Sequence, residues 1–433
     1  MTDTGSGYDV DISGGSGNVV GDYARVVQIF LNGPAPLATR VRTREFGTLV
    51  RERTRMFVGR EFVFDAIREA FDDEGFRSGY VMLRGEPGIG KTAIVAQLVK
   101  DFACVHHFNI APLGIRSAEA FLANVCAQLI LRYGLDYASL PPEATKDGGF
   151  LTGLLEEIAA VPANLPVVVA VDALDESEEA GPATGANRLF LPPYLPDRVY
   201  FVVSTRDGAD SGLHVEARRD IDIHDDDARN VDDVRTYVRQ YVDTNRERMA
   251  PRIEQWAIPE DEFVAVLTQK SAGNFMYLVH VLRDIRDGVL NSSTVDDVRK
   301  LPRGLRDYYD RHWADMRDPD RERFRRYQEP VVCLLATARE PVSAQQLLDW
   351  TRNYWQQQGW NPLGLSPVDV DDVTEAWREF LNSEEFDDGV KYRVYHASFQ
   401  DFLADRVGLT RYHDTIGRTA LAKIPGFLDR DGE

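Results

Sequence analysis

The sequence has few cysteines and no long apolar run. Three of its 433 residues are cysteine, and Cys104, Cys126 and Cys333 lie far apart without a CxxC pair. This spacing argues against a disulfide framework and against a zinc site, so we expect the three thiols to be small core residues. No run of about 18 uncharged apolar residues is present, which excludes a membrane-spanning segment.

The first twenty residues also lack the basic start and apolar block of a secretion signal, so we expect a cytoplasmic protein. Basic residues are outnumbered, because 50 Lys and Arg against 70 Asp and Glu give a formal net charge of −20. This charge disfavours general attraction to phosphate backbones and makes nucleic acid an unfavourable first choice of partner. The hydrophobic content of 43% is typical of a globular chain, and the length predicts two or three domains.

Residues 1–50 differ from the rest because they are rich in Gly, Ser, Asp and Asn, which predicts an appendage and a linker. Over residues 51–225, short β-branched runs alternate with amphipathic helical stretches. We expect strands at 80–83, 106–110, 166–172, 199–204 and 220–223, and helices at 92–102 and 118–132. Strands separated by helices predict an α/β fold with a parallel sheet covered on both faces.

Helical patterns dominate after residue 226, which predicts a helical domain at 226–310 and a winged-helix domain with a tail at 311–433. We expect Asp232 or Asp233 to cap one helix, Asp261 to cap another and Ser343 to cap a third. Further helices are expected at 275–285, 373–381 and 397–405, with a strand at 390–395. No internal repeat of 20–50 residues is visible.

The strongest motif is a complete G-x-x-x-x-G-K-[ST] between an expected strand and an expected helix, and an accidental glycine turn is the simpler alternative. The glycines let backbone N–H groups surround phosphates, and the next helix presents its positive end from Ala93 onwards. In this motif Lys91 binds the β- and γ-phosphates and Thr92 binds Mg²⁺. The loop consists of Gly85, Glu86, Pro87, Gly88, Ile89, Gly90, Lys91 and Thr92.

Acidic residues follow a second apolar strand, as a metal site beside such a loop requires. Asp172 ends the run at 167–172 and is expected to hold Mg²⁺, together with Thr92. Asp175 and Glu176 come directly afterwards, and one of them could orient or deprotonate an attacking water. The alternative is that these two are solvated loop charges.

Two further segments are expected at the same rim of the sheet. The strand at 199–204 leads into Arg206, a candidate γ-phosphate sensor or else a surface arginine. Val58, Gly59 and Arg60 precede the loop by about 25 residues, where an apolar residue and free backbone groups could pack against adenine.

Taken in order, these segments resemble a NACHT-type STAND P-loop NTPase, the ATPase module of bacterial NOD-like receptors. The resemblance covers residues 55–410 and includes FVGRE at 57–61, DALDE at 172–176, STR at 204–206 and SAGNFMYL at 271–278. YHASFQDFL at 395–403 resembles the close of the family's winged-helix domain. There the matching His396 is implied to contact the β-phosphate of ADP, whereas read alone it is equally a hydrogen-bonded core residue.

The resemblance implies a slow ATPase that binds ATP or ADP with Mg²⁺ and forms homo-oligomers when a trigger, not identifiable from the sequence, activates an immune, antiviral or cell-death response. The family's C-terminal sensor is missing, which predicts either a minimal member or a piece of a longer chain. The rival interpretation is an AAA+-like ATPase or ATP-dependent regulator acting on nucleic acid or protein. A scaffold without hydrolysis finds no support, because Lys91, Thr92, Asp172 and Glu176 are all present.

Two β-prone segments around a glycine-rich middle lie between Asp9 and Phe30. Such segments can stack in register, and Asn18 and Gln28 could form amide ladders. They resemble amyloid signalling motifs, which would recruit a separate effector once the chain oligomerises. A disordered tail or a small docked hairpin is the alternative.

Overall fold

The computed structural model describes residues 36–110, 113–161, 166–178, 186–209, 212–290, 297–386 and 389–422. The expected amyloid-like segments of residues 9–30 lie outside this part of the chain. The expected linker is shorter than residues 1–50, because Leu37–Arg40 and Thr43–Thr54 form helices α1 and α2. Phe46 of α2 is 1% exposed in the core, and its burial explains why this segment folds as a helix.

Five parallel strands form the central sheet in the order β2-β3-β4-β1-β5. The expected strands are confirmed, although β2 ends two residues earlier than expected. The register places Tyr80 of β1 beside Phe201 of β4. The strands are β1 (Gly79–Gly85), β2 (Val105–Phe108), β3 (Val167–Asp172), β4 (Val199–Arg206) and β5 (Arg218–Ile223).

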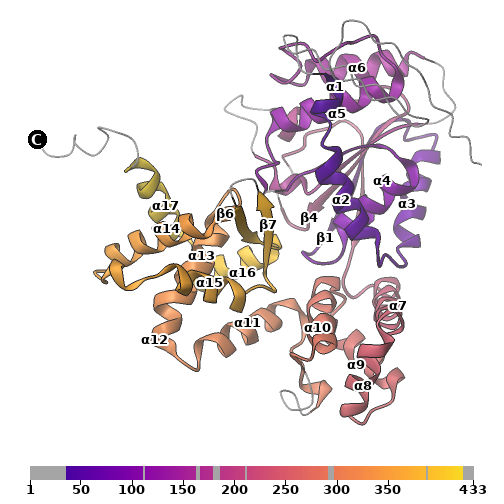
Figure 1. Cartoon of the computed structure of the whole chain (residues 1–433). Helices are drawn as coiled ribbons and strands as arrows, with labels where there is room; N and C mark the ends of the chain where they lie inside the picture. The colour runs from indigo at the N-terminus through magenta and orange to yellow at the C-terminus, as the bar shows by residue number, and fades with distance from the viewer. Residues whose placement is uncertain are drawn as a thin grey trace, which may run out of the picture.

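Helices cover both faces of this sheet (Figure 1). On one face, Val81 and Leu83 pack with apolar residues of α2, α3 and α4, while Tyr80 and Met82 pack on the other face against α5 and α6. This alternation follows from the two-residue period of a strand and explains the nearly continuous apolar run in β1. The remaining helices here are α3 (Glu61–Asp72), α4 (Lys91–Phe102), α5 (Ala118–Tyr133) and α6 (Gly149–Ala159).

A group of four helices follows the sheet and lies below it in Figure 1. The expected caps are wrong in two cases: Asp227 caps α7, and Pro259 precedes α9, so Asp261 lies inside the first turn. Asp233 instead accepts a hydrogen bond from the backbone of Arg60. The group consists of α7 (Ala228–Thr244), α8 (Arg246–Gln255), α9 (Glu260–Ser271) and α10 (Phe275–Asp287).

The C-terminal part has the expected winged-helix arrangement of helices and a small antiparallel sheet in the order β6-β8-β7. Ser343 caps its helix as expected, through a capping box with Gln346. The bounds expected for the helix at 373–381 are wrong. The observed helix ends at Ala376, and Leu381 pairs with Val394 in the sheet.

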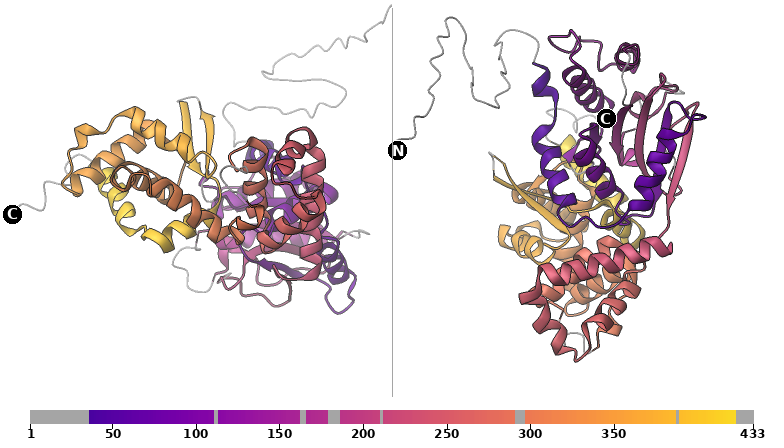
Figure 2. Two further views of the ribbon diagram at one scale, coloured as in Figure 1. Left: turned by 90° about the horizontal axis from the view of Figure 1, so that it is seen from below. Right: turned by 90° about the vertical axis from the view of Figure 1, so that its right-hand side faces the viewer.

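This part contains α11 (Gly304–Arg317), α12 (Arg321–Arg323), a π-helical turn (Phe324–Gln328), α13 (Glu329–Thr337), α14 (Ala344–Gln357), α15 (Pro367–Ala376), α16 (Ala397–Val407) and α17 (Thr410–Leu421), with strands β6 (Val342–Ser343), β7 (Leu381–Phe386) and β8 (Gly389–Val394). Figure 2 shows α11–α17 to one side of the sheet domain. One continuous apolar core joins α7–α10 to this part, with Trp377 fully buried. No helix of the described residues is long and apolar enough to span a bilayer.

The expected fold class is therefore confirmed: an α/β sheet of the P-loop NTPase type is followed by helical and winged-helix regions. All three cysteines are buried, as expected. Because α10 and α16 both reach the carboxyl ends of β1 and β4, residues from three parts of the chain meet at that edge of the sheet.

Candidate nucleotide site

The loop at 85–92 connects the end of β1 to the start of α4. Gly88 and Gly90 have φ angles of 86° and 102°, which favour glycine. Gly90 precedes α4 and supplies no side-chain cap. The first N–H groups of this helix, at Lys91, Thr92 and Ala93, are therefore not bonded to a capping side chain. A helix start of this kind attracts anions, because its N–H groups and its dipole both favour negative charge.

Lys91 folds back onto its own loop. Its Nζ donates to the carbonyl of Gly85 at 2.7 Å and to that of Glu86 at 3.1 Å. Burial lowers the pKa of Lys91, and the charges of Asp175 and Asp172 partly offset this effect. The ammonium is therefore within the electrostatic reach of two carboxylates, and a phosphate group bound at the start of α4 would form a charge-assisted hydrogen bond with it.

Asp172 lies at the end of β3 and is 3% exposed. Ser204 Oγ donates to its Oδ1 at 2.5 Å and accepts from the N–H of Ala173 at 2.8 Å. Ala173 has a φ of 51°, a costly conformation for a non-glycine residue that Ser204 helps to hold. Burial raises the pKa of Asp172, whereas hydrogen bonds from Ser204 and Thr92 lower it. Asp172 and the Thr92 hydroxyl thus lie together, as the sequence predicts.

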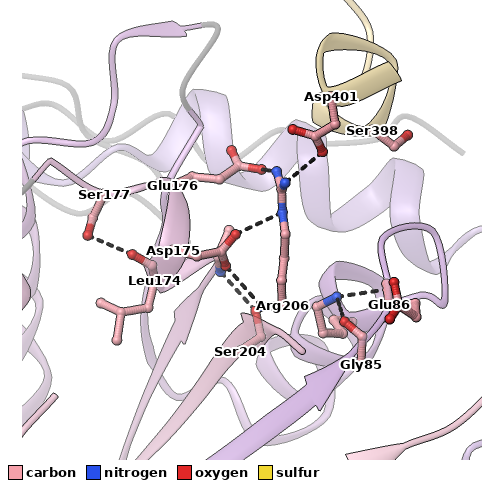
Figure 3. A network of polar contacts seen from close by, with 12 residues as sticks. Gly85, Glu86, Leu174, Asp175, Glu176, Ser177, Ser204, Arg206, Ser398 and Asp401 are labelled. Carbon is pink, nitrogen blue, oxygen red and sulfur yellow. Dashed lines mark hydrogen bonds and ion pairs between the residues drawn. The ribbon is translucent and has the colours of Figure 1, made fainter. Parts of the chain in front are cut away.

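Arg206 extends from the end of β4 toward three carboxylates, which Figure 3 shows. Its Nε lies 2.9 Å from Asp175, one Nη lies 3.7 Å from Glu176, and the other lies 2.6 Å from Asp401 Oδ2 on α16. Asp175 also accepts from the N–H of Arg206 at 3.2 Å. Arg206 therefore links the acidic turn after β3 to the winged-helix region.

His396 is the first residue before α16 and acts as its N-cap. Its Nδ1 accepts from the N–H of Ser398 at 3.1 Å and lies 2.7 Å from the Ser398 hydroxyl. Burial, with the nearby charges of Arg53 and Arg206, lowers the pKa of His396 to about 3. The ring is therefore neutral at pH 7, and because Nδ1 is an acceptor, the ring proton lies on Nε2.

A cavity of about 460 Å³ joins these groups, a volume within the usual range for small-molecule sites. Its lining includes Pro87, Gly88, Gly90, Lys91 and Thr92 of the loop, together with Asp172, Arg206 and His396. Val58 and Arg60 of the entry segment also line it, as do Asp175 and Glu176. Phe57, Phe275, Met276 and Tyr395 contribute as well, from segments that carry the family resemblance. The sequence did not indicate Arg53, Met56, Tyr237 and Val279, which also line the cavity.

The comparison with protein families agrees with this geometry. The AAA ATPase domain family matches residues 56–191. Among curated proteins, none matches the sequence. The similar solved structures include a mutant of RuvB from Thermotoga maritima, with 13% identity, 80% of this chain and 95% of that chain covered, and a TM-score of 0.31. Another is Cdc6p from Pyrobaculum aerophilum, with 10% identity, 80% and 93% covered, and a TM-score of 0.32.

The chain carries a P-loop NTPase domain. This conclusion rests on the sheet, the loop with its lysine and threonine, and the family match to an ATPase domain. The domain contains residues that fit a nucleotide with Mg²⁺. Lys91 and the start of α4 suit phosphates, while Thr92 and Asp172 supply the oxygen ligands that Mg²⁺ prefers, usually with water and phosphate oxygens completing its shell.

The members of the entry segment serve different roles in the structure. Val58 lines the cavity, whereas Gly59 has a φ of 64° and leaves no room for a side chain beside Asp233. Arg60 is 2% exposed, and its Nη2 donates to the carbonyl of Ile89 at 2.6 Å. Burial lowers the pKa of Arg60 to about 10, although Asp233 opposes this shift. Arg60 thus contacts the backbone of the loop as well as lining the cavity.

Proposed function

We propose that this chain is a nucleotide-operated signalling switch similar to NACHT-type STAND NTPases. It binds ADP or ATP with Mg²⁺, hydrolyses ATP slowly and oligomerises with itself on activation. The observation that supports this best is the cavity, because residues of the loop and Tyr395 and His396 of the winged-helix region line it together. A ligand in it contacts both parts, so its chemical form changes the free energy of their association.

His396 supplies the contact that favours ADP in the closed arrangement. Its Nε2–H is a neutral donor directed by the cap on Nδ1, and the ring belongs to the lining of the cavity. A phosphate oxygen is a strong acceptor for such a donor. The nucleotide would then join the sheet domain to α16.

Arg206 supplies the contact that distinguishes ATP from ADP. In this structure its guanidinium is shared by Asp175, Glu176 and Asp401. The third phosphate of ATP adds negative charge that competes with Asp401 for Arg206. Loss of the contact with Asp401 weakens the attachment of α16 and favours the open arrangement.

For hydrolysis, we assign Lys91 to charge stabilisation of the phosphates, Thr92 and Asp172 to Mg²⁺, and Asp175 or Glu176 to the attacking water. Asp175 is bound to Arg206 in the closed arrangement and is therefore poorly placed to act as a base. This arrangement favours slow turnover, as a switch requires.

The test is to measure bound nucleotide and particle mass of the purified chain before and after addition of ATP and Mg²⁺. We expect retained ADP and a monomer at first, then a larger assembly with ATP. The Lys91→Ala variant should neither bind nucleotide nor assemble. A wild-type chain without affinity for adenine nucleotides, or with affinity but no change in shape or mass, would refute the proposal.

The AAA ATPase domain match also favours a second candidate, an ATPase or regulator that acts continuously on nucleic acid or protein. The nucleic-acid version is opposed by α15, which takes the place of the recognition helix in a helix-turn-helix. This helix, PVDVDDVTEA, carries Asp369, Asp371, Asp372 and Glu375 and no basic residue, so it would repel DNA phosphates. ATP hydrolysis stimulated several-fold by duplex DNA would favour this second candidate over the switch.

The output is proposed to pass through residues 1–33, whose β-prone segments would stack when several copies assemble and would recruit a separate effector. Deletion of residues 1–33 should leave ATP-dependent assembly intact and abolish signalling toxicity in cells. Unchanged toxicity would refute this part.

A further inference from the structure

Two carbonyl groups of the phosphate loop accept hydrogen bonds from the start of α10. Asn274 Nδ2 donates to the carbonyl of Pro87 at 2.8 Å. The N–H groups of Phe275 and Met276 donate to the carbonyl of Gly88 at 3.0 and 3.2 Å. Carbonyl groups of the loop before α4 therefore occupy the start of α10, although the two segments lie 187 residues apart in the sequence.

The next carbonyl along the loop has an external donor as well. Ile89 accepts from Arg60, whose guanidinium also lies 4.8 Å from the centre of the Phe275 ring. Arg60 in turn is held by Asp233 of α7, which accepts from its backbone N–H at 3.0 Å. Three consecutive carbonyls of the loop are thus turned outward, toward groups supplied by the helical region and the entry segment.

This arrangement determines where the loop's N–H groups point. In a trans peptide the C=O and the following N–H point in opposite directions. Outward carbonyls at 87, 88 and 89 therefore turn the following amides to the opposite side, where the N–H of Ile89 donates to the carbonyl of Glu86 at 3.3 Å and those of Gly88 and Gly90 face the proposed anion site. Convergent amides of this kind are what an anion-binding loop requires.

We propose that Asn274 is a positioning residue for the nucleotide: it holds the phosphate loop in its binding conformation and makes the docking of α10 part of nucleotide affinity. This inference rests on the proposed nucleotide binding. Asn274 serves both elements at once, because its Oδ1 accepts from the N–H of Tyr277 at 3.1 Å as the cap of α10 while its Nδ2 holds Pro87. By linkage, nucleotide that orders the loop strengthens the docking of α10 to the same extent.

The close packing at Gly88 agrees with this role. A Cβ added there would lie 2.5 Å from Asn274 Oδ1, so the glycine is required by the approach of α10 as well as by its own φ. The two elements therefore fit only when the loop keeps this conformation.

The experiment compares Asn274→Ser with Asn361→Ser. Serine keeps a capping oxygen at either position, but at 274 it is too short to reach the carbonyl of Pro87. Asn361 caps a short turn by accepting from the N–H of Leu363 at 3.1 Å and is not part of the cavity, so it controls for the loss of the amide. Isothermal titration with ADP should show about three- to tenfold weaker binding for Asn274→Ser, the effect of one hydrogen bond. Asn361→Ser should match the wild type.

The apo melting temperatures of both variants show whether the change in affinity reflects general instability. Equal melting temperatures with weaker ADP binding for Asn274→Ser alone support the positioning role, and wild-type affinity overturns it. A wild-type chain that binds no ADP overturns the proposed function itself, whereas the Asn274→Ser result bears only on the loop.

A measurement on the wild-type chain covers the case in which Asn274→Ser does not fold. Hydrogen exchange of the Phe275 and Met276 amides should slow on addition of ADP, because both are bonded to Gly88. The start of α14, capped by Ser343 away from the cavity, provides the reference and should not change. Unchanged exchange at 275 and 276 in the presence of bound ADP overturns the inference.

Discussion

The ion pair between Arg206 and Asp401 leads to a quantitative prediction for the Asp401→Asn variant, which removes one charge and keeps the side-chain size. The two side chains are 26% and 51% exposed, so solvent screens their attraction. Exposed pairs contribute about 0.2–1 kcal/mol, and the 2.6 Å contact places this one near the upper end. A loss of about 1 kcal/mol shifts the ratio of closed to open arrangements by about fivefold.

The assay is the release of a fluorescent ADP analogue when excess ATP is added. Asp401→Asn should release the analogue up to about fivefold faster than the wild type, if release follows opening. Asp405→Asn is the matched control, because Asp405 lies on the same helix and pairs with Arg306 of α11 at 3.2 Å instead of reaching the sheet domain. Wild-type release from Asp401→Asn, or equal acceleration by both variants, would refute the role of this ion pair.

The sheet and the phosphate loop could be predicted from the sequence because their signals are local. The apolar runs of β1, β3 and β4 are nearly continuous, and β3 and β4 end in Asp172 and Arg206, which reach the site. The helix cap at Ser343 could also be predicted, since Gln346 completes a local capping box. In these segments the signal comes from neighbours within a few residues, and there the expectation and the structure agree.

The helix starts show where local patterns are ambiguous. Acidic residues occur at 225–227 and again at 232–233, and all of them are acceptable caps. The buried side of α7, including Val234 and Val238, is the same for either start, so hydrophobic spacing does not choose between them. In the structure Asp233 accepts a hydrogen bond from Arg60 instead of capping α7. Arg60 lies 173 residues earlier in the sequence, so a local pattern does not include it.

The contacts that join the sheet domain to the helical and winged-helix regions at the site could not be predicted from the sequence for the same reason. Arg206 and Asp401 are separated by 195 residues, and Asn274 and Pro87 by 187. No periodicity or motif records such pairs, although SAGNFMYL did mark the segment that supplies Asn274. Tyr237 has a helical pattern typical of core residues and nothing that indicates a place in the cavity.

Three further predictions follow from individual groups. Asp172→Asn retains an oxygen for Ser204 but loses the charge for Mg²⁺, so Mg²⁺ should no longer strengthen ATP binding in titrations; retained Mg²⁺ dependence would move the metal elsewhere. Trp377→Ala removes a fully buried ring beside Trp313 and should cost about 3–5 kcal/mol of unfolding free energy in urea, whereas a loss under 1 kcal/mol would contradict its packing. The last concerns pH. Burial lowers the pKa of both His107 and His280 to about 3, below the usual value of 6.5. The unfolded chain therefore binds more protons below pH 6.5, so the stability that these neutral rings contribute is complete above pH 6.5 and is lost as the pH falls toward 3. Each histidine should contribute a slope of up to about 1.4 kcal/mol per pH unit in that range. His280→Phe keeps a ring against Tyr308 but does not titrate, and urea unfolding at pH 7 and pH 5 should therefore show a smaller loss of stability than in the wild type. An equal loss in both chains would show that His280 is already protonated, or exposed, in the folded state.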